Sequence, residues 1–218
     1  MIKKAHDLYY SRKYDFVEDF RVRCHRTLSW LQKSQDLKDD ELDLKFVSLW
    51  IAFNALYGKD LKNYQLGDKE AFQSFISEIC ALDSNNSLHH ILWDVFSNSV
   101  KVLLENKFTF NLFWAFYNGD ESAANWEEVF AQSKSKAIKA MSEQNTSQIL
   151  FVVFDRLYTV RNQVMHGGST FGSQANRIQL RDACEILENV VPVMLLIMME
   201  NYSLDRTFGQ PFYPYVKD

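Results

Sequence analysis

Residues that interrupt helices are scarce along most of this chain. The sequence has three prolines, all beyond residue 190, and seven glycines among its 218 residues. Proline and glycine are the residues that most strongly disfavour the interior of a helix, so long stretches without them favour regular helix. We therefore predict a fold that is mostly α-helix.

The length and the hydrophobic content predict one compact domain over residues 1–218. Hydrophobic residues make up 47% of the chain, which is enough to bury a sizeable core. Aromatic side chains gather in residues 107–143, a possible helical insert, and again in the tail 203–218. The tail is too aromatic for a solvated segment and too proline-interrupted for a helix, so we expect it to pack on the domain or on a partner.

Hydrophobic periodicity and turn signals place the expected helices. They cover Tyr14–Leu37, Asp40–Tyr57, Lys69–Leu82, Leu88–Glu105, Phe110–Tyr117, Glu121–Glu143, Ser147–His166 and Gln174–Asn201. The alternating piece Lys107–Phe110 has the pattern of a strand, but no partner strand is evident nearby. Among the aromatic residues Phe113, Trp114, Phe116 and Tyr117, packing is a simpler interpretation than base stacking.

Cysteine usage favours a cytoplasmic protein. Cys24, Cys80 and Cys184 are isolated and show neither zinc-finger spacing nor a disulfide framework. The first residues lack the apolar core of a signal peptide. The greasiest run, Val190–Met199, is too short to cross a bilayer, so we expect a buried helix kinked at Pro192 and no membrane partner.

A nucleic-acid site on this chain would have to be a local basic patch, because the formal net charge is −4. Two groups of basic residues are candidates, although a solvated helix face explains either group equally well. The first is Arg21, Arg23 and Arg26, with Arg12, Lys13 and Lys33 nearby, and the second is Lys134, Lys136 and Lys139.

The expected helix 147–166 has two distinct faces. An apolar stripe of core-facing spacing runs along Ile149, Val153, Leu157, Val160 and Val164. A separate polar stripe carries Asp155, Thr159, Asn162 and His166, and we expect it to face solvent, a cleft or a partner.

Arg161 and His166 have the chemistry for phosphodiester cleavage without a metal. Arginine stabilises phosphate charge, and histidine transfers a proton near neutral pH. Arg161 lies about 140° from His166 around an ideal helix, so one chain is not expected to bring them together, whereas two copies packed about a two-fold axis could. In the structural alternative, His166 and Gly167 merely cap the helix and Arg161 is solvated or salt-bridged.

The segment Arg161-Asn162-Gln163-Val164-Met165-His166 resembles the Arg-x(4–6)-His motif of the HEPN superfamily. A softer resemblance, to HEPN proteins of the Apea-like kind, is carried by Phe46–Gly58, which contains Trp50 and Asn54. These two residues lie four apart on one helical face, where we expect them to support the motif helix structurally. The resemblance implies an all-α antiparallel bundle with additional helices.

The resemblance also implies a function, namely metal-independent endoribonuclease activity in a homodimer, with toxin or defence biology. His166 is then the general acid or base, Arg161 stabilises phosphate charge, and Asn162 orients the substrate or the histidine. No cofactor or metal is expected, and the expected partners are RNA, a second copy and an antitoxin or regulatory protein. The alternative is a non-catalytic RNA-binding or protein-interaction module.

Overall fold

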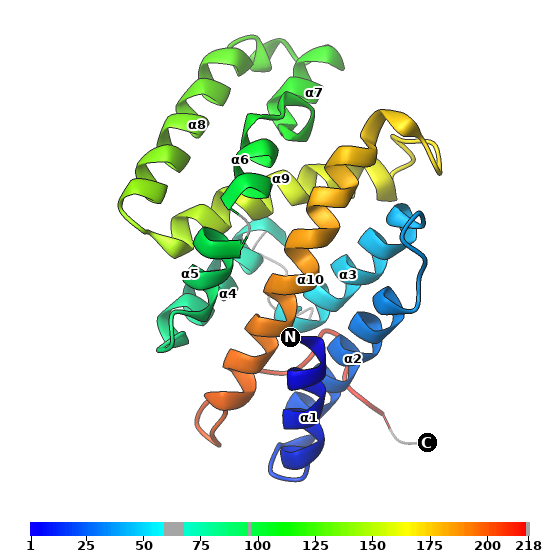
Figure 1. Ribbon diagram of the computed structural model, residues 1–218, viewed down its shortest axis with the longest axis vertical. Coiled ribbons are helices and arrows are strands. Elements are labelled where there is room, and N and C mark those ends of the chain that lie inside the picture. Colours follow the sequence, from blue (N-terminus) through cyan, green and yellow to red (C-terminus); the bar gives the residue numbers. More distant parts are fainter. Residues whose placement is uncertain (59–67, 96, 217–218) are drawn as a thin grey trace. The chain divides into compact units, whose positions relative to one another are not determined.

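The computed structural model describes residues 1–58, 68–95 and 97–216, and the regular elements are helices in all of these ranges (Figure 1). Within them no strand is present, and the β-type pairing is one isolated bridge between Ser203 and Arg206. The all-α prediction is therefore confirmed. The α-helices are α1 (Ile2–Arg12), α2 (Glu18–Gln35), α3 (Leu42–Tyr57), α4 (Asp68–Leu82), α5 (Ser87–His90), α6 (Ser97–Glu105), α7 (Asn111–Tyr117), α8 (Trp126–Ser142), α9 (Thr146–Met165) and α10 (Arg177–Glu200).

Helix α1 is an element that the sequence analysis did not predict. Its buried residues Ile2, Ala5 and Tyr9 are spaced three and four apart, as one face of a helix requires. The remaining positions of the helix are mostly polar, so the apolar signal rests on three side chains. Three apolar positions are too few to distinguish a helix from an irregular polar segment.

Several expected elements are shorter or differently built than predicted. The expected helix 88–105 divides into α5, a π-helical turn η2 (Ile91–Val95) and α6, and residue 96 lies outside the described residues. Residues 121–143 divide into a 3₁₀ turn η4 (Glu121–Ala123) and α8. The possible strand at Lys107 is a 3₁₀ turn, η3 (Lys107–Thr109), because the Asn106 side chain accepts a hydrogen bond from the Phe108 amide.

The described chain forms two compact units. The first comprises residues 1–88 and 187–218, and the second comprises residues 89–186, so α10 contributes a segment to each. The aromatic segment 107–143 lies wholly in the second unit. In the first unit, α2 and α3 are packed side by side and joined by a short connection, as expected for an antiparallel pair (Figure 1).

A fully buried arginine lies in the first unit. Arg23 on α2 is 0% exposed and donates hydrogen bonds to the carbonyl oxygens of Leu56 and Gly58, at 2.6 and 3.0 Å. Its other terminal nitrogen donates to the carbonyls of Gly209 and Gln210, at 3.3 and 3.0 Å. Burial lowers the pKa of Arg23 to about 10. The prediction that Arg23 belongs to a surface basic patch is therefore wrong, because its guanidinium satisfies backbone carbonyls inside the unit.

The carboxyl-terminal tail packs on its own unit. Phe208 is buried and stacks on Phe20, with ring centres 5.5 Å apart, and Pro211 is also buried. Arg26 donates to the carbonyl oxygen of Tyr213. This is the first of the two packing modes expected for the aromatic tail, and residues 217–218 of the predicted segment lie outside the described residues.

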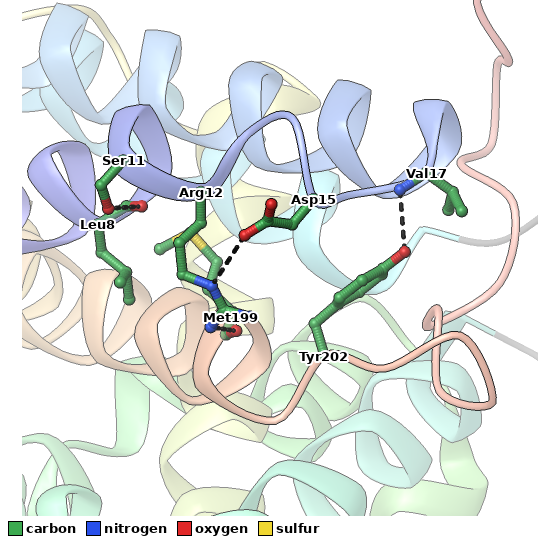
Figure 2. A network of polar contacts seen from close by, with 7 residues as sticks. All are labelled: Leu8, Ser11, Arg12, Asp15, Val17, Met199 and Tyr202. Carbon is green, nitrogen blue, oxygen red and sulfur yellow. Dashed lines mark hydrogen bonds and ion pairs between the residues drawn. The ribbon is translucent and has the colours of Figure 1, made fainter.

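Polar contacts connect the turn after α1 to the end of α10 (Figure 2). Arg12 donates to the Met199 carbonyl at 2.9 Å and lies 3.7 Å from the Asp15 carboxylate. The Tyr202 hydroxyl accepts from the amide of Val17 at 2.9 Å. The Arg12 guanidinium is therefore bound at the C-terminal end of α10, where exposed carbonyl groups favour a cation.

The second unit has an aromatic core. Phe110, Phe113 and Trp126 form a buried cluster, against which Leu112, Val129 and Phe130 pack. Packing, the simpler of the two interpretations of this segment, is confirmed for Phe113. Trp114, Phe116 and Tyr117 are 37%, 40% and 64% exposed, so packing alone does not account for them.

The apolar run Val190–Met199 is buried along its whole length, as predicted for a core segment, and α10 continues through Pro192. No helix in the described part of the chain is long and apolar enough to span a bilayer.

Candidate Arg–His site

Local sequence signals place the ends of α9. The Asn145 side chain caps its first turn by accepting from the amide of Gln148. The stripe predicted to face the core does so at Ile149, Val153, Leu157 and Val160, all 1% exposed or less, and Val164 is half-buried. The helix ends at Met165, and His166 is its C-terminal cap residue.

The residue after the cap has the conformation that glycine allows most readily. Gly167 has φ +72°, in the left-handed region that commonly follows a helix end. A Cβ atom at Gly168 would lie only 3.1 Å from the carbonyl oxygen of Gln163, so a side chain at this position would require the backbone of α9 to shift by a few tenths of an ångström. The glycine pair therefore turns the chain sharply away and leaves His166 exposed at the end of α9.

Arg161 and His166 contact each other within one chain. Nη1 of Arg161 lies 3.4 Å from Nε2 of His166. The expectation that one chain does not bring them together is therefore wrong. The angular argument treated both side chains as radial, whereas arginine is long and flexible. In addition, His166 has left helical geometry, with φ −101° and ψ 15°.

Asn162 orients the arginine. Its Oδ1 atom accepts a hydrogen bond from Nη1 of Arg161 at 2.9 Å, and the guanidinium lies 5.6 Å from the centre of the Tyr158 ring. Nε of Arg161 is buried and has no hydrogen-bond partner within the described residues. Arginine can only donate, so its contact with His166 is a hydrogen bond when Nε2 carries no proton. In that contact the imidazole is neutral and its Nε2 lone pair is occupied by the guanidinium, so proton abstraction through Nε2 requires Arg161 to turn away from it.

The polar stripe of α9 is divided between core and surface. His166 is exposed and Asn162 half-buried, in agreement with a stripe that faces solvent or a partner. Thr159 is 3% exposed, and its hydroxyl donates to the backbone carbonyl of Asp155 at 3.3 Å. The expectation that all four polar residues lie outside the core is therefore wrong for Thr159, because its own helix satisfies its hydroxyl. Asp155 is half-buried.

Trp50 and Asn54 lie on α3 in the first unit. Trp50 is 1% exposed and packs against the rings of Phe46 and Phe53, with centres 6.1 and 5.5 Å away. Asn54 accepts a hydrogen bond from the Tyr57 hydroxyl at 3.1 Å. Both residues thus contact side chains of their own helix. Their expected support of the motif helix stays a prediction.

Gln163 is a residue near the site that the sequence analysis did not select. Its Nε2 donates to the carbonyl oxygen of Phe108 at 2.7 Å, and Nε1 of Trp114 donates to the same oxygen at 2.8 Å. This shared acceptor connects the end of α9 to the aromatic segment. A contact over 55 residues of sequence leaves no local signal, so spacing alone could not have indicated it.

Arg156 is a second buried arginine, on the core side of α9. It is 0% exposed, and its guanidinium lies 4.4 and 5.2 Å from the ring centres of Phe110 and Phe130. Nη2 donates to the Ser133 hydroxyl at 3.0 Å, while Nε and Nη1 have no hydrogen-bond partner in the described chain. Burial lowers the pKa of Arg156 to about 10. Its environment is that of a core residue rather than of an open anion site.

The second basic group is partly engaged by its neighbours on α8. Lys134 lies 5.7 Å from the centre of the Phe130 ring, and Lys139 is 3.7 Å from the Glu143 carboxylate, whereas Lys136 is exposed. Such contacts are typical of a solvated helix face.

Comparisons of the chain with protein-family models, with curated proteins and with solved structures give no match. The functional argument therefore depends on the residues of α9 and their surroundings.

Proposed function

We propose that this protein is a metal-independent endoribonuclease in which Arg161 and His166 form the reactive site. The observation that carries the proposal is the 3.4 Å approach of Arg161 Nη1 to His166 Nε2, at an exposed helix end. A cation that accommodates phosphate and a side chain that can carry a proton are thereby placed within reach of one ligand.

In the proposed reaction, the phosphate draws the Arg161 guanidinium away from the imidazole, and neutral His166 then accepts the proton of a ribose 2′-hydroxyl through Nε2. The 2′-oxygen then forms a bond to phosphorus, and the bond from phosphorus to the 5′-oxygen breaks. The departing 5′-oxygen takes a proton from an imidazolium, which leaves a 2′,3′-cyclic phosphate on one product. Arg161 stabilises the charge on the phosphate oxygens, and Asn162 keeps its guanidinium in position.

A second copy of the chain completes this proposal. In an in-line displacement, the base and the acid act on opposite sides of phosphorus, whereas each chain offers one exposed histidine at the end of α9. Two copies related by a two-fold axis supply two such histidines to one cleft. We propose RNA and a second copy as the partners, with an antitoxin or regulatory protein restraining a toxin- or defence-type activity in the cytoplasm.

The experiment is cleavage of a mixed RNA pool by the purified protein in the presence of a chelator, with analysis of the product ends. We expect cyclic-phosphate ends from the unaltered protein and a loss of at least about 100-fold in rate for His166→Ala. Arg161→Lys keeps the charge but loses the planar guanidinium, and should lose about 10²- to 10³-fold in kcat.

Matched variants separate the site from general damage. Arg181→Lys changes an exposed arginine on α10 in the second unit and should leave the rate unchanged. Equal cleavage by the unaltered protein and His166→Ala would place the activity elsewhere or in a contaminant. Absence of cleavage in a folded protein that still binds RNA would favour the non-catalytic binding module.

A further inference from the structure

Two of the exposed aromatic rings in the segment 107–143 lie next to each other, on either side of the buried cluster member Phe113 in the sequence. Phe108 is 42% exposed and Trp114 is 37% exposed, and their ring centres lie 6.2 Å apart. Packing within the described residues therefore leaves a large part of each ring in contact with solvent. Paired exposed aromatic side chains are the feature that binds unstacked nucleic-acid bases.

A hydrogen bond holds the Trp114 ring, and hydrogen bonds to the backbone of Phe108 together with a ring contact hold the Phe108 ring. The Trp114 indole donates to the Phe108 carbonyl at 2.8 Å, and the Phe108 amide donates to Asn106 Oδ1 at 2.9 Å. The Phe108 ring also meets the edge of the buried Phe113 ring, with centres 5.3 Å apart. Because the rings are held in place, little conformational freedom remains to be lost when a ligand stacks on them.

The same carbonyl connects the two rings to the candidate site. Gln163 donates to the Phe108 carbonyl at 2.7 Å. Gln163 precedes His166 by three positions, which is less than one helical turn. The aromatic pair is therefore anchored to the last turn of α9, within the same unit.

A basic side chain lies beside the pair. Nζ of Lys107 is 5.5 Å from the ring centres of both Phe108 and Phe113, and Lys107 is exposed. A phosphate that follows a stacked base would meet this ammonium group. The aromatic pair can thus contact a base while Lys107 contacts the next phosphate, as the alternation of bases and phosphates along one RNA strand requires.

We propose that Phe108 and Trp114 form a stacking platform for an unpaired base that flanks the scissile phosphate, with Lys107 on the adjoining phosphate. This inference rests on the proposed function and narrows it, because a base held in a duplex cannot stack on the platform. The site then acts on single-stranded or looped RNA and positions it through the platform.

The test measures binding of a labelled single-stranded RNA oligonucleotide in the His166→Ala background, where it is not cleaved. Trp114→Leu should weaken binding roughly 10-fold, a typical effect for one lost stacking partner. Trp114→Phe keeps a ring and should bind within about 3-fold of the parent, as expected for stacking that tolerates different aromatic rings. Phe116→Leu alters an exposed ring on the same helix and should leave binding unchanged.

An RNA with an abasic nucleotide distinguishes stacking on Trp114 from a purely structural role of Trp114. Replacing the base next to the cleavage site by an abasic position should weaken binding to the parent roughly 10-fold, but should cost Trp114→Leu almost nothing further. Additive losses would overturn the platform. So would equal losses in Phe116→Leu and Trp114→Leu, or unchanged binding by Trp114→Leu.

The two proposals can fail separately. Cyclic-phosphate cleavage by the parent, with unaltered KM in Trp114→Leu, would overturn the platform and leave the nuclease standing. A parent that neither binds nor cleaves RNA would overturn both proposals.

Discussion

Arg23 donates from Nη2 to the carbonyl oxygen of Gln210, which lies 187 residues further along the chain. The same guanidinium donates to the carbonyl of Leu56 at the end of α3. One side chain thus holds a helix end and the tail together inside the first unit. Carbonyl dipoles stabilise its charge through the two terminal nitrogens, an arrangement that suits the planar guanidinium.

Arg23→Lys should lower the free energy of unfolding by about 2–4 kcal/mol, because an ammonium group reaches fewer of these carbonyls and leaves the others buried without donors. The tail beyond residue 208 should then become sensitive to limited proteolysis. Arg21→Lys is the matched control on α2, since Arg21 is half-buried and pairs with Glu18, and it should change stability by less than about 0.5 kcal/mol. Equal effects of the two variants in denaturant titrations would contradict this role.

Gly167 should tolerate asparagine better than alanine. With φ +72°, alanine at this position should reduce stability by about 1 kcal/mol, and asparagine by less, because asparagine enters the left-handed region more readily. Thermal unfolding of the two variants measures the difference. If the glycine also sets the position of His166, Gly167→Ala should lose more RNA cleavage than Gly167→Asn. Identical melting temperatures would show that the turn relaxes without strain.

Arg156→Met should stabilise the protein by about 1 kcal/mol at neutral pH. Methionine retains most of the packing on Phe110 and Phe130 and removes a buried cation that has two N–H groups without partners in the described residues. Urea titration measures the change. A loss of stability would instead mean that the charge itself is stabilised by the rings and Ser133.

The advantage of Arg156→Met should diminish at alkaline pH. Burial lowers the folded-state pKa of Arg156 to about 10, below the ordinary 12.5. Between these two values the unfolded state binds more protons, so the stability of the unaltered protein gains a contribution as pH rises through 10. The difference in unfolding free energy between variant and parent should therefore be smaller at pH 11 than at pH 9. A constant difference would contradict the assignment.

Cys80 should react slowly with iodoacetamide in the folded protein, even at pH 9. Burial first, and the nearby Asp83 carboxylate second, raise the pKa of this thiol to about 12, so little reactive thiolate forms. Burial also raises the pKa of Cys24. Mass spectrometry after timed labelling should find both thiols unmodified until denaturant is added. Rapid native labelling of Cys80 would show that α4 opens locally.

The all-α class could be predicted from the sequence because proline and glycine are scarce and the spacing of apolar residues is regular. The core face of α9 could be predicted for the same reason. Sequence patterns did not predict the burial of Arg23 and Arg156, because arginine is usually exposed. The groups that surround these two side chains lie far away in the sequence. Sequence patterns also failed at Arg161 and His166, where side-chain length outweighed the angular position of the backbone.

The division of the chain at residues 88 and 187 has a consequence for synthesis on the ribosome. The unit that carries Arg161 and His166 is continuous in sequence, whereas the other is assembled from a segment before it and a segment after it. Translation therefore delivers every residue of the Arg–His unit before the partners of Arg23 at Gly209 and Gln210 exist. Until residues 209 and 210 have been synthesised, Arg23 has the carbonyls of Leu56 and Gly58 as hydrogen-bond acceptors but lacks the two acceptors of the tail.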